Sequence, residues 1–483
     1  MLDTAAIESL RADLVAADYT LDAVSVRLGD AALAGLARNS TMAAVRALGE
    51  ADDPQADTIR LWLLQQPVPS AHLGGWTSLG ALRAAGLLIG DDDLSATVEL
   101  KPHGSDRRSG WICSDHTPLD GQLSRPRPDF VLGASSASTT LTQLVPPRHY
   151  GRVLDLGTGC GIQALHLDAD EIVGTDLNPR ALELARITLG LSGVAADLRA
   201  GSLYEPVAGE RFDLIVTNPP YVISPPSDDR LVYRDAGLTG DDLMRTVVSG
   251  AADHLTNDGL LVVLGNWPVT AQPWTERVAD WIPAGCDALV LQRELLDAYE
   301  YVELWLADAG LVGAPEYRQR YAEWLDYFDA AGIHAVGLGW LALRKTGRER
   351  PELRLEEWPH GVHQPVGAAI DDFFAAVTPS RLPDAEFLAT RWRVHPDLVQ
   401  ESIGAPGAAD PQHVVLRQRY GFGRAVDAGT ALAGIVGACD GELSIGVLVE
   451  AVAGLLDAHP TELRAEVLPQ LRRLASDGYL LPD

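Results

Sequence analysis

The sequence predicts an α/β fold in which a parallel sheet with crossover helices stands between two mainly helical regions. Three observations carry this prediction. Short apolar runs that end in polar residues recur over residues 151–217, a glycine-rich turn follows the first run, and apolar residues recur at helical spacing in the segments around them. With 483 residues, of which 47% are hydrophobic, the chain is long enough for two or three domains.

The first predicted strand covers residues 151–156 and leads into a turn that contains Gly157, Gly159 and Gly161. Glycines at alternate positions let the backbone pass close beneath a bulky ligand, and the start of the following helix leaves unpaired N–H groups facing it. The spacing differs from the dinucleotide pattern G-x-G-x-x-G, because the third glycine comes one residue early. Asp155 can reach the ammonium group of a bound amino acid, which a nicotinamide cofactor lacks.

The second predicted strand covers residues 171–176 and ends in another carboxylate, Asp176. Its two oxygens match the two hydroxyls of a ribose diol, so Asp176 is a natural ribose ligand. Pro179 suits the first turn of the helix that we expect over residues 180–190. An acid at this point therefore extends the predicted ligand site from the glycine turn to the next strand.

A third short strand and turn is predicted over residues 197–204, and a fourth strand over residues 213–217. The turn after the third strand places Ser202 and Leu203 where an adenine ring would lie. The fourth strand ends just before Asn218, which therefore lies at the same edge of the sheet, because the carboxyl ends of parallel strands share one edge.

The tetrapeptide Asn218-Pro219-Pro220-Tyr221 predicts a site for methylating a planar nitrogen. An amide or exocyclic amino nitrogen is a poor nucleophile, because its lone pair is delocalised. The Asn218 side-chain oxygen and the Pro219 carbonyl can both accept from an NH2 group, the prolines stiffen the loop, and Tyr221 offers a ring face for a flat acceptor. In isolation, a proline-rich turn after a buried strand is an equal alternative, and the preceding motifs decide against it.

In this order of motifs the sequence resembles the class I S-adenosylmethionine-dependent methyltransferases of the Asn-Pro-Pro-Tyr branch, among them the release-factor glutamine (N5) methyltransferases and the small-domain rRNA methyltransferases. The resemblance covers about residues 125–345 and implies a Rossmann-like seven-stranded sheet with S-adenosylmethionine as cofactor. The implied cofactor-binding residues are Asp155, Gly157, Thr158, Gly159, Gly161, Asp176, Leu177, Ser202, Leu203 and Asn218, and the implied catalytic residues are Asn218, Pro219 and Tyr221. Ser202 stands where many members have Asp.

Other segments fit the same resemblance. Residues 129–141 are similar to the segment that covers the cofactor, although a helix cap with surface serines is an equal alternative. Residues 232–244 loosely resemble the lid of the release-factor enzymes. Residues 259–267 and 334–343 are expected to be a fifth buried strand and a member of the antiparallel pair that closes the sheet.

The predicted domains are residues 1–124, a methyltransferase domain over 125–350, and residues 351–483. In the first, helical patterns precede strand-like segments near residues 96–100 and 110–113, and in the third, three helical patterns precede a short final strand. Both arrangements resemble winged-helix modules. The N-terminal helices carry many acids, so we interpret that region as a substrate-recognition or dimerisation module.

The formal net charge of −29 bears on the partners. Enzymes that bind nucleic acid usually present a basic groove, whereas the lysines of this chain are only Lys101 and Lys345. Charge therefore favours a protein substrate, and local arginine clusters keep a nucleic acid possible. The four cysteines are scattered without a CxxC pair, and no metal site is predicted. No apolar stretch reaches 18 residues and the start lacks a leader pattern, so we expect no membrane contact and a cytoplasmic location.

Three functions remain open at this point: a methyltransferase for a protein glutamine, a methyltransferase for adenine N6 or guanine N2 of a nucleic acid, and a non-catalytic module that only binds S-adenosylmethionine. The non-catalytic module is disfavoured, because the chain keeps the whole series of acid, glycines, second acid and Asn218. The sequence leaves open the acceptor, the roles of the flanking regions and the oligomeric state.

Overall fold

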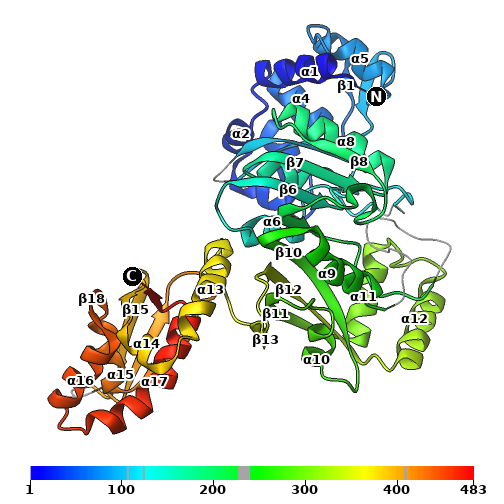
Figure 1. Cartoon of the computed structure of the whole chain (residues 1–483). Helices are drawn as coiled ribbons and strands as arrows, with labels where there is room; N and C mark the ends of the chain where they lie inside the picture. Colours follow the sequence, from blue (N-terminus) through cyan, green and yellow to red (C-terminus); the bar gives the residue numbers. More distant parts are fainter. Residues whose placement is uncertain (1, 106–107, 123–125, 227–239, 407–410, 483) are drawn as a thin grey trace. The chain divides into compact units, whose positions relative to one another are not determined.

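The structure is a computed structural model that describes residues 2–105, 108–122, 126–226, 240–406 and 411–482. The chain forms two compact units (Figure 1), one of Met1–Thr142 with His149–Trp358 and one of Gln143–Arg148 with Pro359–Asp483. The first unit therefore holds both the predicted N-terminal region and the predicted sheet. The domain boundaries after residues 124 and 350 stay predictions.

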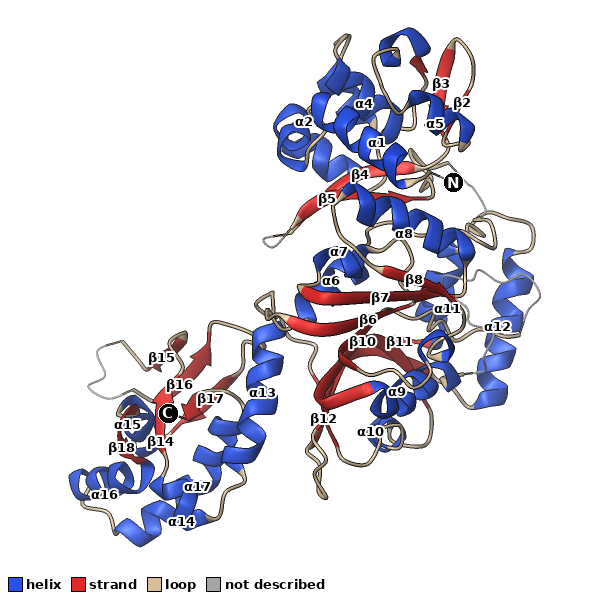
Figure 2. Cartoon of the chain, turned by 45° about the horizontal axis from the view of Figure 1, so that its top comes forward, coloured by secondary structure: helices blue, strands red, loops and turns tan. Residues whose placement is uncertain are grey.

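Among the described residues, an eight-stranded sheet forms the centre of the first unit (Figure 2). Its strands are β6 (Tyr150–Leu156), β7 (Ala169–Asp176), β8 (Asp197–Ala200), β9 (Phe212–Thr217), β10 (Leu255–Val269), β11 (Cys286–Asp297), β12 (Ala335–Lys345) and β13 (Leu353–Glu357). They lie in the order β13-β11-β12-β10-β9-β6-β7-β8. The strands from β8 to β10 run parallel, and β12 is antiparallel to both β10 and β11. The predicted α/β sheet with its closing antiparallel pair is confirmed.

The strand β13 is an addition to the seven strands that the resemblance implies. It pairs in parallel with β11, with Leu353 opposite Ala288. The predicted boundary after residue 350 lies before β13, so the sheet continues past that point. The pattern Leu-Arg-Leu-Glu-Glu did not indicate a strand, because most of its residues are charged and its side chains stay partly exposed at the edge of the sheet.

The core of the sheet is formed by continuous apolar runs in the central strands. Parallel strands are covered by helices on both faces, so both sets of alternating side chains are buried. The buried residues of β6, β9 and β10 include Val153, Leu154, Leu214, Ile215, Val216, Leu261, Val262 and Val263. These runs were the basis of the sequence prediction, and they hold the strand ends that carry the polar residues.

The helices of this part are α6 (Ser136–Leu144), α7 (Ile162–His166), α8 (Pro179–Leu191), α9 (Asp242–His254), α10 (Trp274–Ala279), α11 (Ala298–Asp308) and α12 (Tyr317–Ala331), with a 3-10 turn η2 (Glu205–Val207). The helix α8 begins as predicted, because Pro179 occupies its first turn and Asn178 Oδ1 accepts from Arg180 N at 3.0 Å. The helices α11 and α12 pack on each other and connect β11 to β12 (Figures 1 and 2). We call them the α11–α12 hairpin.

The N-terminal region contains α1 (Thr4–Ala16), α2 (Leu21–Leu36), α3 (Met42–Leu48), α4 (Pro54–Trp62), α5 (Leu79–Ala84), η1 (Ser70–Leu73), β1 (Val68–Pro69), β2 (Leu88–Ile89), β3 (Asp93–Ala96), β4 (Glu99–Gly104) and β5 (Ser109–Ser114). Helices precede a β4–β5 hairpin, as the sequence predicted. The helix α8 contacts both α1 and β5, and Cys113 N donates to Thr188 Oγ1 at 2.9 Å. The region is thus packed against the α/β part.

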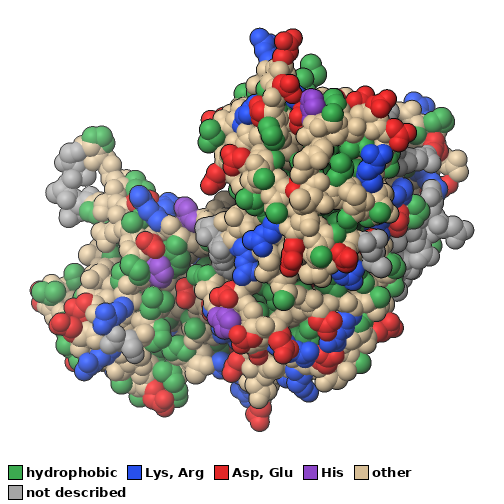
Figure 3. All heavy atoms as spheres, turned by 90° about the horizontal axis from the view of Figure 1, so that it is seen from above, with side chains coloured by type: hydrophobic (Ala, Val, Ile, Leu, Met, Phe, Trp, Pro, Cys, Tyr) green, Lys and Arg blue, Asp and Glu red, His purple; other side chains and the backbone are tan. Residues whose placement is uncertain are grey.

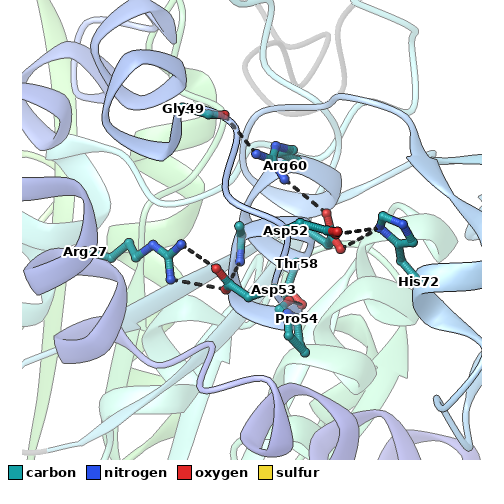
Figure 4. A network of polar contacts seen from close by, with 10 residues as sticks. Arg27, Gly49, Asp52, Asp53, Pro54, Thr58, Arg60 and His72 are labelled. Atoms are coloured by element: carbon teal, nitrogen blue, oxygen red, sulfur yellow. Dashed lines mark hydrogen bonds and ion pairs between the residues drawn. The ribbon is translucent and has the colours of Figure 1, made fainter.

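A network of charged side chains holds the start of α4 (Figure 4). Asp53 caps the helix by accepting from Ala56 N at 3.0 Å, and it binds Arg27 through both oxygens, at 3.1 and 2.6 Å. The Arg27 hydrogen bond lowers the pKa of Asp53 below its usual value. Because Asp53 and Arg27 come from different helices, the pair joins α2 to α4.

Asp52, Asp57 and His72 lie beside this network, with their ligand atoms within 4.8 Å of one another. The Asp57 carboxylate is already engaged: one oxygen accepts from Arg60 Nη1 at 3.1 Å, and the other lies 2.9 Å from His72 Nδ1. We therefore interpret the cluster as an ion-pair network of the N-terminal region and not as a metal site.

The second unit contains α13 (Gly367–Ser380), α14 (Asp384–Ala389), α15 (Thr430–Gly437), α16 (Ile445–Leu455), α17 (Pro460–Ser476), β14 (Arg391–Val394), β15 (Leu398–Ile403), β16 (His413–Gln418), β17 (Ala425–Ala428), β18 (Asp440–Ser444) and β19 (Leu480–Pro482). Its described strands form the sheets β18-β14-β19 and β15-β16-β17. The three predicted helices and the final strand are present. The unit has more strands than its helical pattern indicated, because strands of three to six residues leave little periodic signal.

Within the described ranges, a search for a helix long and apolar enough to cross a membrane finds none.

Candidate active site

A cavity of about 390 Å³ lies at the carboxyl edge of the parallel strands. Its walls come from the segments that follow β6, β7, β8 and β9, together with residues between 130 and 138 and one residue of α9. The predicted site residues that line it are Gly157, Thr158, Gly159, Asp176, Leu177, Ser202, Leu203, Asn218 and Pro219. Asp155, Gly161 and Tyr221 are not part of its lining. The structure thus brings together nearly all residues that the sequence selected.

The glycine turn after β6 adopts a conformation that requires glycine. Gly157, Gly159 and Gly161 have φ angles of 74°, 54° and 81°, in the left-handed region that other residues rarely enter. A Cβ atom on Gly161 would also lie 3.3 Å from Ala185 in α8. The alternate glycines therefore shape the cavity wall, and Gly161 contributes through packing against α8 instead of facing the cavity.

Asp155 lies beneath this turn, with 1% of its surface exposed. Its Oδ2 atom accepts from Thr158 Oγ1 at 2.6 Å and from Ala164 N at 3.1 Å, which joins the strand to the turn and to α7. Burial raises the pKa of Asp155 to about 6, and nearby Asp176 adds to the increase. The structure therefore gives Asp155 a role in holding the turn, whereas its predicted contact with an ammonium group stays a prediction.

The pKa of Asp155 leads to a test of stability without cofactor. Its pKa lies above the ordinary value, so the folded state binds more protons than the unfolded state. Its stabilising contribution is complete below about pH 4 and is lost as pH rises through about 6. An amide keeps the same acceptor oxygen without the charge. Between pH 4 and pH 8, we expect wild type to lose roughly 2 to 3 kcal/mol of unfolding free energy relative to Asp155→Asn.

Urea denaturation of both proteins at a series of pH values measures this difference. Comparison with the Asn variant removes the contributions of all other titrating groups. A difference that stays constant from pH 4 to pH 8 would show that Asp155 titrates normally in the folded protein.

Asp176 lies on the cavity wall at the end of β7. Its Oδ2 atom accepts from Gly159 N at 2.9 Å and its Oδ1 atom from Asn178 N at 2.8 Å. Burial raises the pKa of Asp176 above its usual range. Each carboxylate oxygen has two lone pairs, so both oxygens can still accept from a diol. The backbone bonds fix the direction in which this carboxylate faces the cavity.

The segment 130–138 covers one side of the cavity and is held from two elements. Asp115 Oδ2 accepts from Val131 N at 2.9 Å and from Arg180 Nε at 3.0 Å, and Asn178 Nδ2 donates to Asp129 O at 2.9 Å. The hydroxyls of Ser135 and Ser138 lie 3.1 Å apart and bond at the start of α6, while both residues also line the cavity. The segment therefore does both things that the sequence offered as alternatives: it forms a wall of the cavity, and its serines cap the start of α6.

Asn218 stands where β9 ends, and its Oδ1 atom is buried without a hydrogen-bond partner among the described residues. The preceding Thr217 is fully buried and donates from Oγ1 to Leu156 O at 2.6 Å, which anchors the strand end to β6. The Pro219 carbonyl accepts from Tyr221 N at 2.8 Å and keeps a second lone pair. A buried unpaired acceptor is costly, so this oxygen is suited to receive a donor from a ligand.

The Tyr221 side chain packs against the hydrophobic core of the sheet and is partly buried. Burial raises the pKa of Tyr221 to about 12, with further increases from Glu294 and Asp308, so the phenol is neutral. These two acids belong to β11 and α11. Tyr221 therefore faces the α11–α12 side of the sheet edge, and its predicted contact with an acceptor stays a prediction.

Thr175 is a cavity residue that the sequence analysis missed. It precedes Asp176, is 1% exposed, and its Oγ1 atom has no partner among the described residues. Gln163 also lines the cavity, and its amide is fixed by Ser138 O at 2.8 Å and Thr142 Oγ1 at 3.0 Å. A threonine at the end of a buried strand is common, so its sequence carried no distinctive signal. The predicted lid at 232–244 lies outside the described residues as far as residue 239.

The residues around the cavity fit S-adenosylmethionine. A glycine turn with free space above it, the half-buried Asp176 carboxylate beside it and oxygens of Thr175 and Asn218 without a partner among the described residues offer contacts for an amino acid, a ribose and a polar acceptor. Leu177 and Leu203 add apolar surface on the side of β7 and β8. Among the described residues that line the cavity, only Asp176 and Cys160 carry a carboxylate or thiol that could bind a metal.

Comparisons with known proteins agree with this geometry. Residues 133–279 match the family described as methyltransferase small domain, and residues 16–99 match a domain of unknown function (DUF7059). The matched methyltransferase segment contains the glycine turn, Asp176 and the tetrapeptide.

Three curated proteins show the range of relatives. The release factor glutamine methyltransferase of Deinococcus radiodurans is 34% identical over 212 residues, which cover 38% of this chain and 73% of that protein. The Bordetella pertussis protein of the same name is 32% identical over 252 residues, covering 49% and 80%. Ribosomal RNA small subunit methyltransferase C of Salmonella arizonae is 28% identical over 190 residues, covering 38% and 49%. The chain thus spans most of the first two relatives and about half of the third.

Proposed function

Because the chain belongs to the family of the release factor glutamine methyltransferases, we propose that it methylates the amide nitrogen of a glutamine side chain in a protein. The chain is an S-adenosylmethionine-dependent methyltransferase, and its acceptor is the subject of the proposal. The second candidate acceptor is an amino group of a nucleobase, adenine N6 or guanine N2. The ribosomal RNA methyltransferase among the relatives is the observation that favours it.

The observation that carries the proposal is the unpaired Oδ1 atom of Asn218 at the end of β9. It is an acceptor in a place where the chain provides no donor within the described residues. A primary amide or an amino group supplies one N–H to it and a second N–H to the neighbouring Pro219 carbonyl. A hydroxyl or a thiol has a single hydrogen and satisfies only one of the two.

In the proposed reaction the protein mainly positions its ligands. The glycine turn and Asp155 hold the methionine end of the cofactor, Asp176 holds the ribose, and Ser202 and Leu203 lie beside the adenine. When bound, S-adenosylmethionine supplies a methyl group that its sulfonium already activates. Little proton chemistry is therefore needed before transfer.

On the acceptor side, Asn218 Oδ1 and the Pro219 carbonyl accept from the NH2 group and turn its lone pair toward the cofactor side. As positive charge grows on that nitrogen, the same two oxygens stabilise it. The proton that becomes acidic after transfer leaves to water. Tyr221 offers its ring face to the planar group.

The negative charge near the acceptor side favours a protein substrate over a nucleic acid substrate. β11 runs parallel to β10, so the α11–α12 hairpin starts at the same edge of the sheet as Asn218. Residues 294–331 contain nine acids and only Arg318 and Arg320 as basic residues. Figure 3 draws one face of the whole chain, on which basic side chains lie among acidic ones. Phosphate backbones bind to continuous basic surfaces, so the many acids of residues 294–331 disfavour a nucleic acid.

A labelling experiment distinguishes the two acceptors. We expect the full-length protein, incubated with cell extract and S-adenosylmethionine labelled in the methyl group, to produce label that protease releases and nuclease does not. Digestion of the labelled band should give a peptide with a mass increase of one methyl group on glutamine. Nuclease-sensitive label would instead support the nucleobase acceptor. The cytoplasmic location and the recognition or dimerisation role of the N-terminal region stay predictions.

A further inference from the structure

We propose that Tyr301 and Trp324, on the α11–α12 hairpin, are positioning residues for methyl transfer. They hold the backbone that leaves the Asn-Pro-Pro-Tyr tetrapeptide by binding both polar groups of Ile223. The proposal rests on the proposed function, because it assigns the fixed geometry of Asn218 and Pro219 to contacts outside the cavity.

The clamp consists of two hydrogen bonds to one residue. Ile223 N donates to the Tyr301 hydroxyl at 2.9 Å, and Trp324 Nε1 donates to Ile223 O at 3.0 Å. All three residues are buried, with 1%, 0% and 5% of their surfaces exposed for Ile223, Tyr301 and Trp324. Water therefore does not compete for these bonds, and the chain two residues after Tyr221 has one defined position.

A third hydrogen bond extends the clamp to the sheet. Asn266 Nδ2, on β10, donates to the same Tyr301 hydroxyl at 2.9 Å, and Asn266 is fully buried. β10 is the direct neighbour of β9, with Val263 opposite Thr217. Tyr301 thus joins the strand beside the tetrapeptide to the segment after it, and both are fixed relative to Asn218.

Packing keeps the Tyr301 hydroxyl in place as a neutral acceptor. Its ring lies in an apolar cluster with Val222, Ile223 and Phe328, and the ring centroids of Tyr301 and Phe328 are 5.8 Å apart. Burial raises the pKa of Tyr301 well above its usual value, so the phenol stays protonated at any physiological pH. On the same hairpin, Tyr327 accepts from Gly240 N at 3.1 Å, which attaches the chain just before α9 as well.

The geometry indicates a positioning role and not a catalytic one, because neither Tyr301 nor Trp324 lines the cavity. Their effect on the reaction passes through Ile223 to the tetrapeptide. If the hydroxyl of Tyr301 is removed, the N–H of Ile223 and the amide of Asn266 lose their acceptor in a buried site, and the segment must move or rearrange to regain one. A small displacement of the acceptor-binding atoms then reduces transfer without changing the cofactor side.

Two variants and one control test the proposal. Tyr301→Phe removes the acceptor of Ile223 N, and Trp324→Phe removes the donor to Ile223 O. Tyr321→Phe is the control, because its hydroxyl donates to Glu303 Oε1 at 3.1 Å inside the same hairpin and not to the segment after the tetrapeptide. For each full-length protein, the rate of hydrogen exchange in peptides covering residues 218–226 shows whether the clamp is intact. Calorimetry with S-adenosylmethionine measures the affinity of the cofactor site.

Transfer is measured as initial rates of label incorporation over a dilution series of one cell extract, which gives an apparent KM and kcat. We expect Tyr301→Phe and Trp324→Phe to speed exchange in residues 218–226 and to lower kcat on the order of 10-fold to 100-fold. The cofactor dissociation constant should change less than about 2-fold, and Tyr321→Phe should match wild type in all three measurements.

Unchanged exchange in both clamp variants overturns the proposal, whatever the transfer assay shows. A loss of cofactor affinity that parallels the loss of kcat also overturns it, because it would mean a general structural defect. If wild type labels no protein in the extract, the proposed acceptor fails, and the exchange measurement alone decides on the clamp. Faster exchange with an unchanged kcat would also overturn the proposal, because the clamp would then stabilise the segment without affecting methyl transfer.

Discussion

The variant Asn218→Ala is expected to bind S-adenosylmethionine nearly as well as wild type and to lose most of its methyl transfer. The removed Oδ1 atom is a buried acceptor without a partner among the described residues, whereas the glycine turn and Asp176 do not depend on it. Loss of one preorganised polar contact to a developing charge lowers kcat by roughly 100-fold or more. The measurement combines label transfer to the protein fraction of an extract with calorimetry of the cofactor.

Two further variants sharpen this prediction. Asn218→Asp keeps an acceptor oxygen at the same position, so it should retain more activity than Asn218→Ala. Asn257→Ala is a matched control, because Asn257 is an exposed asparagine on β10. Wild-type turnover in Asn218→Ala would refute the assignment of Asn218 as an acceptor ligand. An equal loss in the Asn257 variant would point to a general effect on the sheet.

The second large effect is expected for Asp176→Ala, which should weaken cofactor binding on the order of 10-fold to 100-fold, as expected for a lost hydrogen bond to a charged group. The carboxylate lies on the cavity wall and is fixed by Gly159 N and Asn178 N. Calorimetry with S-adenosylmethionine and with S-adenosylhomocysteine measures the affinity. Because both ligands carry the same ribose, both should lose affinity to a similar degree.

Asp176 also holds the glycine turn, so a second variant separates its two roles. Asp176→Asn keeps an oxygen for one backbone N–H but lacks the second acceptor for a diol. It should therefore destabilise the turn less than Asp176→Ala does and still bind the cofactor more weakly than wild type. Asp170→Ala is the control, because Asp170 is an exposed acid near the other end of β7. Wild-type affinity in Asp176→Ala would refute the assignment of Asp176 to the ribose.

The cofactor side could be predicted because its residues follow one another at fixed places in the chain. A strand must end in a glycine turn, and the next must end in an acid, for these groups to meet at one edge. That rule selected Gly157, Gly159, Asp176 and Asn218, all of which line the cavity. Asp155 was selected by the same rule, but the sequence could not show that Thr158 and Ala164 engage its carboxylate from the buried side.

The contacts that hold the acceptor side could not be predicted, because they join residues far apart in sequence. Nothing near Ile223 indicates that Tyr301 and Trp324, 78 and 101 residues away, bind its backbone. The strand β11 was also missed. Its apolar first half continues into charged residues at a bulge near Gln292, which breaks the regular pattern. The α11–α12 hairpin that follows carries both acids and aromatic residues. A helical pattern alone does not predict what these residues do.

The clamp on Ile223 also determines the order in which the protein becomes competent while it is being made. Every described residue that lines the cavity lies at or before Leu243, whereas the clamp requires Tyr301 and Trp324. A ribosome adds about 5 to 20 residues per second, so the lining residues are synthesised on the order of 10 s before Trp324. A growing chain therefore contains the described cavity residues before it contains the residues that we propose to position the tetrapeptide. A chain that ends before Trp324 therefore lacks one of the two contacts that we propose to position the tetrapeptide.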